Sequence, residues 1–393
     1  MTDVTLLDAD GATRPLTLRE RAWLQRPGAP LRSRVAYAAA HVVPRVSGEN
    51  VPGAPADVDW DATLAFRDHL WSWGLGVADA MDTAQRNMGL DPAATRELIA
   101  RSAAAARTAG GALVVGVNTD HVADEVISLS QVIDAYVEQL HFAEEQGAGV
   151  VLMASRHLAR AATGPADYER VYREVIARAG QPVLLHWLGE AFDANLRGYF
   201  GSTDATEAAD VVVRIIERDA EKIRGIKMSL LDADAEISLR ARLPEGVSMF
   251  TGDDYHYVDL IAGDGERESQ ALLGAFAAIG PLASAAIATL DAGDPAGYRA
   301  LLAPTEPLSR QVFAAPTAYY KTGIAFLSWL NGHQPAFSMV GGLHSGRSLP
   351  HLSEIVRLAN EAGALEDPEL AARRWNALLA LHGVETANRV LVP

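Results

Sequence analysis

The stretch KIRGIKMS, residues 222–229, decides both the fold and the candidate site of this chain. It is typical of a short buried strand that follows a helix expected over 210–220, and it carries Lys227 near its end. Lysine is rare here: of 34 basic residues, only Lys222, Lys227 and Lys321 are lysines. Arginine stays protonated, whereas burial can turn lysine into a neutral, nucleophilic amine. Lys227 is therefore either a reactive amine or a side chain that reaches out of the strand to a nearby carboxylate.

Strand-like and helix-like segments alternate on both sides of this stretch. Uninterrupted βα repetition demands parallel pairing with right-handed crossovers, and eight units favour a closed (β/α)8 TIM barrel over an open α/β sheet. No glycine-rich phosphate fingerprint follows the first strand, which argues against a dinucleotide-binding fold. The expected strands cover residues 34–43, 74–81, 112–117, 149–153, 182–187, 223–228, 247–250 and 270–276.

From Pro281 onward the strand pattern stops and helical segments follow. They are expected over 282–291, 295–313, 319–330, 352–362 and 368–381. We therefore expect three regions: an N-terminal arm at 1–33, the barrel at 34–280 and a C-terminal helical region at 281–393.

Composition excludes several functions. A net charge of −16 over 393 residues argues against binding to nucleic acid or to an anionic membrane surface. The absence of cysteine excludes disulfides, thiolate metal sites and cysteine nucleophiles. No signal-peptide pattern and no apolar run of about 18 residues occurs, so we expect a cytoplasmic protein.

Barrel enzymes carry their chemistry at the C-terminal ends of the strands. Polar residues gather there in this sequence: Asp82 and Thr83, Asn118 and His121, His157, His186, Lys227, and Asp253 to His256. His186 and Lys227 end neighbouring strands, so their side chains are expected to converge. His186 is alternatively a packed core histidine, Asp253 the start of the next helix, and His157 and His256 solvated loop residues.

At these residues the chain resembles the dihydrodipicolinate synthase and N-acetylneuraminate lyase family of class I aldolases, as a divergent branch. In that family the sixth strand ends in Gly-Ile-Lys, whose lysine forms a Schiff base, and the seventh carries Ser/Thr-Gly-Asp-Asp. Here these motifs are residues 225–227 and 251–254. Residues 182–187 resemble the family's Pro-Val-x-x-Tyr-Asn strand, and residues 320–323 its C-terminal Val-Lys-Ala helix. The resemblance covers about residues 32 to 365.

Two departures fall in the expected pocket. His186 replaces the family's proton-relay tyrosine, and residues 80–85 (AMDTAQ) replace the Gly-Thr-Thr-Gly-Glu loop that holds a substrate carboxylate. The resemblance thus implies carbon–carbon lyase (or dehydrating) chemistry on a different substrate, with Lys227 as nucleophile and His186 as acid/base. It implies no cofactor and no metal, and we expect a homo-oligomer, dimer or tetramer. Substrate contacts are expected from Asp82, Thr83, Asn118, Gly252 and Asp253.

The partner we expect is a small-molecule carbonyl compound other than pyruvate. An ionised Asp82 within ~4 Å of a substrate carboxylate would repel it by ~4 kcal/mol at an effective dielectric constant of ~20. Hydroxyl groups reverse the sign, because they donate charge-assisted hydrogen bonds to a carboxylate. We therefore predict a neutral, hydroxyl-rich substrate such as a keto sugar, unless Arg86 or Arg156 neutralises Asp82.

Two other hypotheses stay open at this point. One is a divalent-metal-dependent TIM-barrel hydrolase or isomerase, with Asp82, His121, His186 and Asp253 as ligands. Against it, the first strand lacks the His-x-His pair common in such barrels and has only His41. The other is a non-catalytic barrel kept as a binding or regulatory protein.

Overall fold

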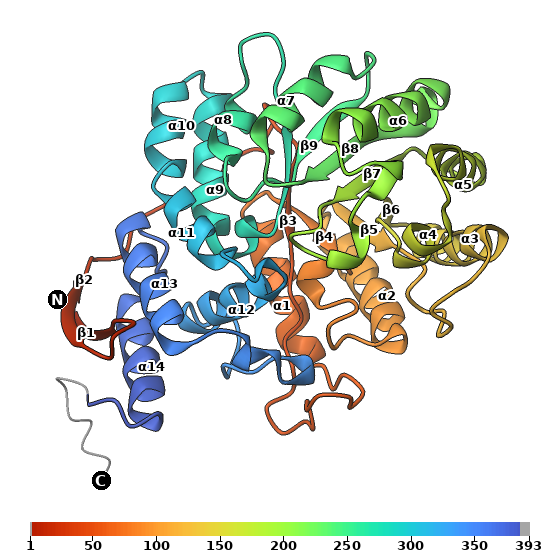
Figure 1. Ribbon diagram of the computed structural model, residues 1–393. Helices are drawn as coiled ribbons and strands as arrows, with labels where there is room; N and C mark the ends of the chain where they lie inside the picture. The colour runs from red at the N-terminus through yellow and green to blue at the C-terminus, as the bar shows by residue number, and fades with distance from the viewer. Residues whose placement is uncertain (1, 386–393) are drawn as a thin grey trace.

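Eight parallel strands form a closed barrel in the computed structural model, which describes residues 2–385. The strands close in the order β10-β3-β4-β5-β6-β7-β8-β9, and helices surround them (Figure 1). The predicted (β/α)8 barrel is confirmed. The strands are β3 (Ala36–Ala39), β4 (Gly76–Asp79), β5 (Leu113–Val117), β6 (Gly149–Leu152), β7 (Val183–Leu188), β8 (Ile223–Ser229), β9 (Ser248–Thr251) and β10 (Gln270–Leu273).

The helices begin and end at residues that favour those positions. Asp91 caps the second helix by accepting from the Ala94 amide, Pro92 occupies its first turn, and Gly110 ends it with φ 65°. The helices of the barrel are α1 (Trp60–Ser72), α2 (Pro92–Ala109), α3 (Leu129–Glu145), α4 (Arg156–Ala161), α5 (Pro165–Ala177), α6 (Ala205–Arg218), α7 (Ala233–Arg242), α8 (Tyr257–Ala262) and α9 (Ala275–Asp291).

A C-terminal group of helices follows the barrel, as predicted. It consists of α10 (Pro295–Leu302), α11 (Thr305–Val312), α12 (Tyr320–Leu330), α13 (Leu349–Ala362) and α14 (Pro368–Leu381). Short 3-10 turns connect the elements: η1 (Asp82–Ala84), η2 (Ala194–Leu196), η3 (Tyr199–Gly201), η4 (Ala220–Lys222), η5 (Thr317–Tyr319) and η6 (Val340–Gly346). Within residues 2–385 no helix is long and apolar enough to cross a lipid bilayer.

Several predicted boundaries differ from the structure. The single helix expected over 295–313 is two helices, because Pro304 has no amide proton with which to continue α10. The boundary expected at residue 280 falls inside α9, which packs on β3 and completes the barrel's outer ring. The last strand ends at Leu273 rather than Phe276.

Apolar side chains fill the barrel below the strand ends. They include Tyr37, Val114, Leu184, Phe250 and Leu272, all buried. One glycine makes this packing possible: a Cβ on Gly225 would overlap the carbonyl oxygen of Ser248 and lie 2.9 Å from the Phe250 ring. Gly225 thus lets β8 and β9 approach closely, two residues before Lys227.

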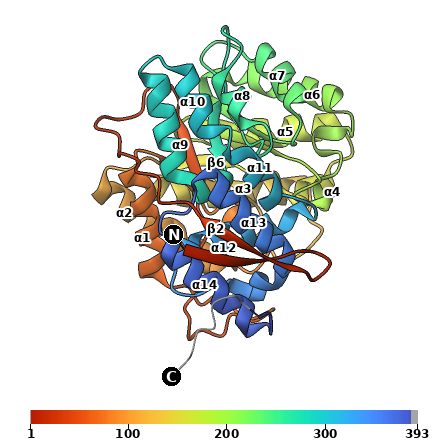
Figure 2. The ribbon, with the colours of Figure 1, turned by 90° about the vertical axis from the view of Figure 1, so that its left-hand side faces the viewer.

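The N-terminal arm folds into a hairpin of β1 (Thr2–Leu7) and β2 (Thr13–Leu18), which the sequence reading did not predict. Figure 2 shows this hairpin lying across the C-terminal helices. The Thr5 carbonyl accepts from Trp375 Nε1 at 2.7 Å, and the Leu7 amide donates to Ser353 Oγ at 2.7 Å. The two ends of the described chain are therefore packed together.

Candidate active site

His186 and Lys227 lie side by side on adjacent strands. β7 and β8 pair in parallel with His186 opposite Lys227, so both side chains project to the same face of the sheet. Leu184 shares that face of β7 and belongs to the barrel interior. Both residues therefore project into the barrel, where the sequence expected them to converge.

Lys227 has the environment of a reactive amine. Only 7% of the residue is exposed, and its Nζ donates no hydrogen bond to any residue within 2–385. Burial lowers the pKa of Lys227 below its ordinary value, and the nearby carboxylates of Asp82 and Asp254 raise it by less. The sequence also left open a lysine that reaches out of the strand to a nearby carboxylate; Asp82 and Asp254 are near, but within residues 2–385 Lys227 forms no ion pair with either. Lys222 does bind at the surface, to the carbonyls of Ala177 and Ala179.

His186 is fully buried and weakly held. Its Nε2 lies 3.3 Å from the Ser229 hydroxyl, and its Nδ1 has no hydrogen-bond partner among the described residues. Burial, and then the charge of Lys227, lower the pKa of His186 well below its ordinary value, so the imidazole is neutral.

Gly252 belongs to the site for a steric reason. A Cβ at this residue would lie 2.6 Å from Lys227 Cε and would overlap Ser229 Oγ. The Gly252 amide also donates to the Met228 carbonyl at 2.8 Å, which holds the end of β9 against β8. The glycine of the 251–254 motif thus makes room for the lysine side chain.

The two adjacent acids 253 and 254 have different roles. Asp253 accepts from the amides of Tyr255 and His256 and pairs with His256 Nδ1 at 2.9 Å, so it holds a turn. Asp254 is the carboxylate near Lys227, and its Oδ1 accepts from the Ala275 amide at 2.8 Å, at the start of α9. Burial raises the pKa of Asp254 to about 7. Sequence reasoning selected Asp253, because the motif alone did not distinguish the two.

The loop after β4 carries Asp82 and Thr83, both expected to contact substrate. Asp82 lines a cleft and lies close enough to Lys227 to raise the pKa of that lysine. Thr83 is buried, and its hydroxyl pairs with the hydroxyl of Tyr320 at 2.8 Å. Ala80 and Gln85 in this loop have φ of 49° and 67°, a conformation that non-glycine residues rarely adopt.

Bonds to other parts of the chain hold this loop in place. Gln85 donates to the Val340 carbonyl at 2.9 Å, and Arg86 donates to the Gly116 carbonyl at 2.6 Å. Arg86 also forms a short ion pair with Asp120 and is therefore not free for Asp82. Strained backbone that is held in this way is common at functional sites.

The C-terminal helix α12 contributes two further groups, which sequence reasoning did not assign to the site. Tyr320 stacks on Phe313, with ring centroids 4.4 Å apart, and bonds Thr83. Lys321 is 3% exposed, and its Nζ donates to the Ala318 carbonyl at 3.1 Å. Burial lowers the pKa of Lys321 to about 8, against the opposing effect of Asp82. Asp82 therefore lies near two of the three lysines of the chain.

A polar cleft of about 170 Å³ opens beside the ends of β4 to β7. Leu188, two residues beyond His186 on the same face of β7, lines it, so His186 lies one layer deeper. Asn118 also lines the cleft, where its side-chain Nδ2 donates to the Ala154 carbonyl at 3.3 Å. The other polar lining residues are Asp82, Asn87, Thr119, Asp120, Glu125, Arg156, His157, Arg160 and Asp193.

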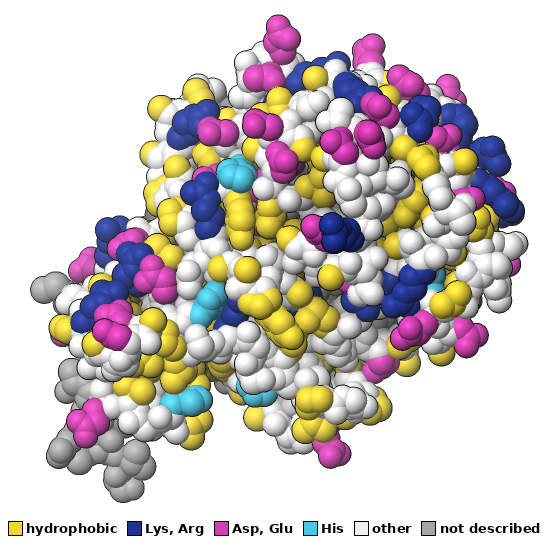
Figure 3. Space-filling model, in the orientation of Figure 1, with side chains coloured by type: hydrophobic (Ala, Val, Ile, Leu, Met, Phe, Trp, Pro, Cys, Tyr) yellow, Lys and Arg dark blue, Asp and Glu magenta, His cyan; other side chains and the backbone are white. Residues whose placement is uncertain are grey.

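The arginines of this cleft already have carboxylate partners. Arg156 pairs with Asp193 at 2.5 Å, and Arg160 with Glu125 at 3.7 Å. His157, expected in a solvated loop, is instead buried on α4 and bonds the Thr119 hydroxyl at 2.8 Å. Over the face in Figure 3, acidic and basic side chains are interspersed rather than gathered into a patch of one sign.

The set of metal ligands weighed from the sequence does not come together. His121 bonds Gln139 at 2.8 Å and lies 3.3 Å from Glu138, on the outer helix α3. Asp253 is engaged with His256. Within residues 2–385, the cluster of His, Asp and Glu side chains with metal-binding spacing is elsewhere, at His69, His333 and Glu366.

Solved structures of dihydrodipicolinate synthases match this (β/α)8 barrel in fold. The dihydrodipicolinate synthase from Aquifex aeolicus is 13% identical with a TM-score of 0.60, over 90% of this chain and 100% of that one. The enzyme from Bacillus anthracis is 15% identical with a TM-score of 0.61, over 83% and 98%. The enzyme from Oceanobacillus iheyensis is 14% identical with a TM-score of 0.60, over 84% and 97%.

Within this fold the chain belongs to one family, described as "Protein of unknown function (DUF993)", which matches residues 4–384. A comparison with curated proteins finds no match. The predicted resemblance to the dihydrodipicolinate synthase family, as a divergent branch, is confirmed at the level of fold.

Proposed function

We propose that this protein is a class I aldolase or lyase that forms a Schiff base through Lys227. The proposal rests on the environment of that amine. Lys227 is buried, its pKa is lowered, and it forms no hydrogen bond with any other residue of the described chain. A lysine in such a site is more easily deprotonated, and the neutral amine is the nucleophile. Asp254, whose pKa is raised to about 7, is a suitable acceptor for the ammonium proton.

The reaction then follows ordinary carbonyl chemistry. The Lys227 amine attacks the substrate carbonyl carbon, and loss of water from the carbinolamine gives an iminium. A base removes the proton of a hydroxyl group on the second carbon from the iminium carbon. The bond between that second carbon and the first then breaks, and the second carbon leaves as the carbonyl group of the first product. The bonding electrons move to the iminium and give an enamine. Protonation of that enamine and hydrolysis release the second product and restore the amine.

His186 is the proposed partner for these proton transfers, through Ser229. The neutral imidazole can accept a proton. Its Nε2 lies 3.3 Å from Ser229 Oγ, which is next to Gly252 and the side chain of Lys227. Burial, and to a lesser extent the charge of Lys227, lower the pKa of His186 in the resting site. That charge is absent while the amine is neutral and returns with the iminium, so His186 is the stronger base when the amine attacks and after the enamine has formed.

The substrate we propose is a neutral, hydroxyl-rich carbonyl compound, such as a keto sugar, rather than pyruvate. Asp82 lines the cleft, and neither arginine considered from the sequence is paired with it, since Arg86 binds Asp120 and Arg156 binds Asp193. Carboxylates, amides and hydroxyls in the cleft suit a ligand that offers many hydroxyl donors. Substrate contacts from Thr83, Asn118, Gly252 and Asp253 remain predictions, as do the cytoplasmic location and the homo-oligomer.

Borohydride trapping tests the proposal. The protein is incubated with a panel of keto sugars or pyruvate and reduced, and the labelled peptide is identified by mass spectrometry. We expect an adduct on Lys227 that is absent from Lys227→Arg and retained in Lys222→Arg. An adduct on Lys321 instead would show that Lys227 is the wrong amine. Efficient labelling of Lys227 by millimolar pyruvate would refute the substrate class and leave the Schiff base intact.

The same experiment separates the other hypotheses. A metal-dependent hydrolase or isomerase would lose activity on chelation and give no adduct, whereas a Schiff-base enzyme keeps both its activity and its adduct in chelator. A non-catalytic barrel would give no adduct on Lys227 with any member of the panel.

A further inference from the structure

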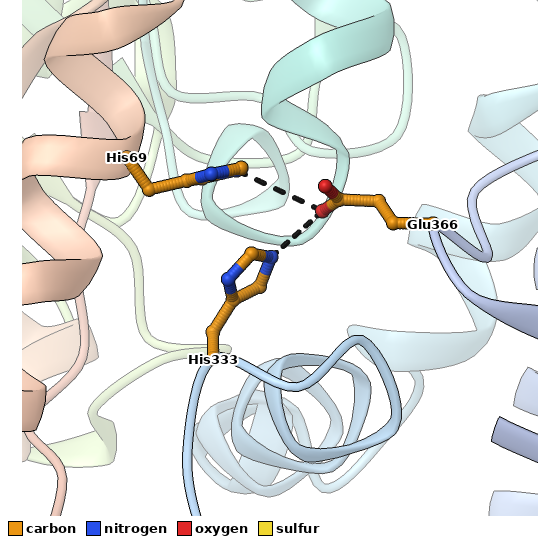
Figure 4. A group of neighbouring side chains, drawn as sticks. All are labelled: His69, His333 and Glu366. Atoms are coloured by element: carbon orange, nitrogen blue, oxygen red, sulfur yellow. Dashed lines mark hydrogen bonds and ion pairs between the residues drawn. The ribbon is translucent and has the colours of Figure 1, made fainter. Parts of the chain in front are cut away.

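Two histidines and one glutamate converge where the barrel meets the C-terminal helices. His69 comes from the last turns of α1, His333 follows α12, and Glu366 precedes α14 (Figure 4). His333 Nε2 lies 2.7 Å from Glu366 Oε1, and His69 Nε2 lies 3.7 Å from the same oxygen. One ligand atom from each residue falls within 4.8 Å of the others. None of the three lines the cleft beside the strand ends.

We propose that this cluster binds a divalent transition-metal ion, with Zn²⁺ as the best fit. Two imidazole nitrogens and one carboxylate oxygen are a common zinc donor set, with water in the fourth position. Nitrogen donors disfavour Mg²⁺ and Ca²⁺, which prefer oxygen ligands.

The distances need little adjustment. Zinc lies ~2.0–2.1 Å from nitrogen and oxygen ligands, so tetrahedral ligand atoms lie ~3.3 Å apart. The two observed separations, 2.7 and 3.7 Å, lie on either side of that value. All three ligand atoms lie within 4.8 Å of one another, so no distance between them has to shorten by more than ~1.5 Å on binding.

The surrounding chain holds these side chains in place. The Glu366 amide donates to Asn331 Oδ1 at 3.0 Å, and Asn331 Nδ2 donates to the Ala364 carbonyl at 2.9 Å. Phe66 stacks near the His69 ring, with an interplanar angle of 14°. The three ligand side chains are between 16% and 22% exposed, so water can reach the fourth position.

A hydrogen bond between His333 and Glu366 would by itself account for the position of the His333 side chain. It does not explain why His69 also faces the same carboxylate oxygen, with its ring centroid 4.1 Å from that of His333. An ion bound by all three would join the barrel helix α1 to two segments of the C-terminal region. We infer a structural role, in which the metal clamps that region to the barrel.

Metal binding to the whole protein tests the inference. Chelator-treated protein is titrated with ZnCl₂, NiCl₂ or MgCl₂ by calorimetry and by thermal unfolding. We expect one Zn²⁺ per chain with micromolar or tighter affinity, a Tm raised by several degrees at saturation, and no response to Mg²⁺. The readout is independent of catalysis, so its failure would not bear on Lys227.

Three variants locate the ion. Glu366→Gln keeps an oxygen that can accept from His333 but loses the charged ligand, and His69→Gln removes the second imidazole. Both should weaken Zn²⁺ binding at least tenfold, while His141→Ala, an exposed histidine on α3, should bind as the parent does. Equal binding by Glu366→Gln and the parent, or no stoichiometric binding by the parent, would overturn the proposal.

Discussion

Gly252 lies directly against the side chain of Lys227: a Cβ at residue 252 would stand 2.6 Å from Lys227 Cε. Real Cβ atoms do not approach other atoms this closely, so any larger residue at 252 forces the side chains of Lys227 and Ser229 to shift. The motif glycine therefore sets the position of the proposed nucleophile.

Gly252→Ala should consequently impair Schiff-base formation. A displacement of about 1 Å at a reacting group can cost on the order of 10²-fold in rate. The rate of borohydride-trapped adduct formation at Lys227 is the measurement. Gly164→Ala is the matched control, because a Cβ there meets nothing within 4 Å and the backbone is extended (φ 176°). Adduct formation at the parent rate in Gly252→Ala would show that the amine tolerates the added methyl group.

His186→Phe should separate chemistry from packing. The ring is fully buried and makes one long hydrogen bond, so an aromatic replacement should leave Tm nearly unchanged. Turnover should fall by ~10²–10⁴, the usual contribution of a positioned acid/base group. Steady-state kinetics and thermal unfolding on the same sample give both numbers. Turnover within a few-fold of the parent would leave His186 as a packing residue.

Asp254→Asn should remove the proposed acceptor of the Lys227 proton and keep the hydrogen bond that residue 254 accepts from the Ala275 amide. Asparagine Oδ1 can still accept from the Ala275 amide, so α9 should begin as before. With its pKa raised to about 7, Asp254 is an ionised base above that pH and a neutral acid below it. In the parent, kcat/KM should therefore rise with pH through about 7.

In Asp254→Asn this rise should disappear, and kcat/KM should fall by ~10²-fold or more at every pH. Asp253→Asn is the informative comparison, because that acid holds a turn with His256. A pH profile that flattens in Asp253→Asn and persists in Asp254→Asn would exchange the roles of the two acids.

Glu236→Gln should stabilise the fold at alkaline pH. This carboxyl group on α7 is buried, its Oε2 has no partner within residues 2–385, and burial raises its pKa to about 8. The folded state thus binds a proton that the unfolded state releases above about pH 4.3, so stability is full below that pH and is lost as pH rises towards 8. Glutamine has no proton to lose and can still accept from Ser269, as Glu236 does at 2.7 Å.

The expected gain in unfolding free energy is ~1–3 kcal/mol at pH 8.5 and near zero at pH 4.5. Urea unfolding at the two pH values measures it. A gain that does not depend on pH would mean that Glu236 is ionised in the folded protein.

The barrel could be predicted because each of its strands and helices is indicated by a short continuous stretch of sequence. Each strand is a short apolar run followed by a helical pattern, and parallel βα repeats leave few topologies. The same rule placed His186 beside Lys227, which the β7–β8 register reproduces. Gly225 and Gly252 could be found as motif residues, although the steric reason for each lies in contacts between neighbouring strands.

The other features of the candidate site depend on contacts between segments that are far apart in the sequence. Sequence alone could not choose between Asp253 and Asp254, because the turn after β9 decides which of the two carboxylates lies near Lys227. Nor could it place Tyr320 and Lys321 beside Asp82, since the 237-residue separation of Thr83 from Tyr320 leaves no periodic signal. The composition did give one clue: Lys321 is one of three lysines in an arginine-rich chain.

The docking of the N-terminal hairpin on the C-terminal helices sets an order of events during synthesis. β1 binds Ser353 and Trp375, partners that the ribosome adds more than 340 residues later. Until those residues emerge, Val4 and Leu6 on the same strand have no helix surface to pack against, although both are buried in the finished protein. Barrel strands, whose neighbours are close in sequence, can assemble during that interval. The hairpin is made early and reaches its native contacts late.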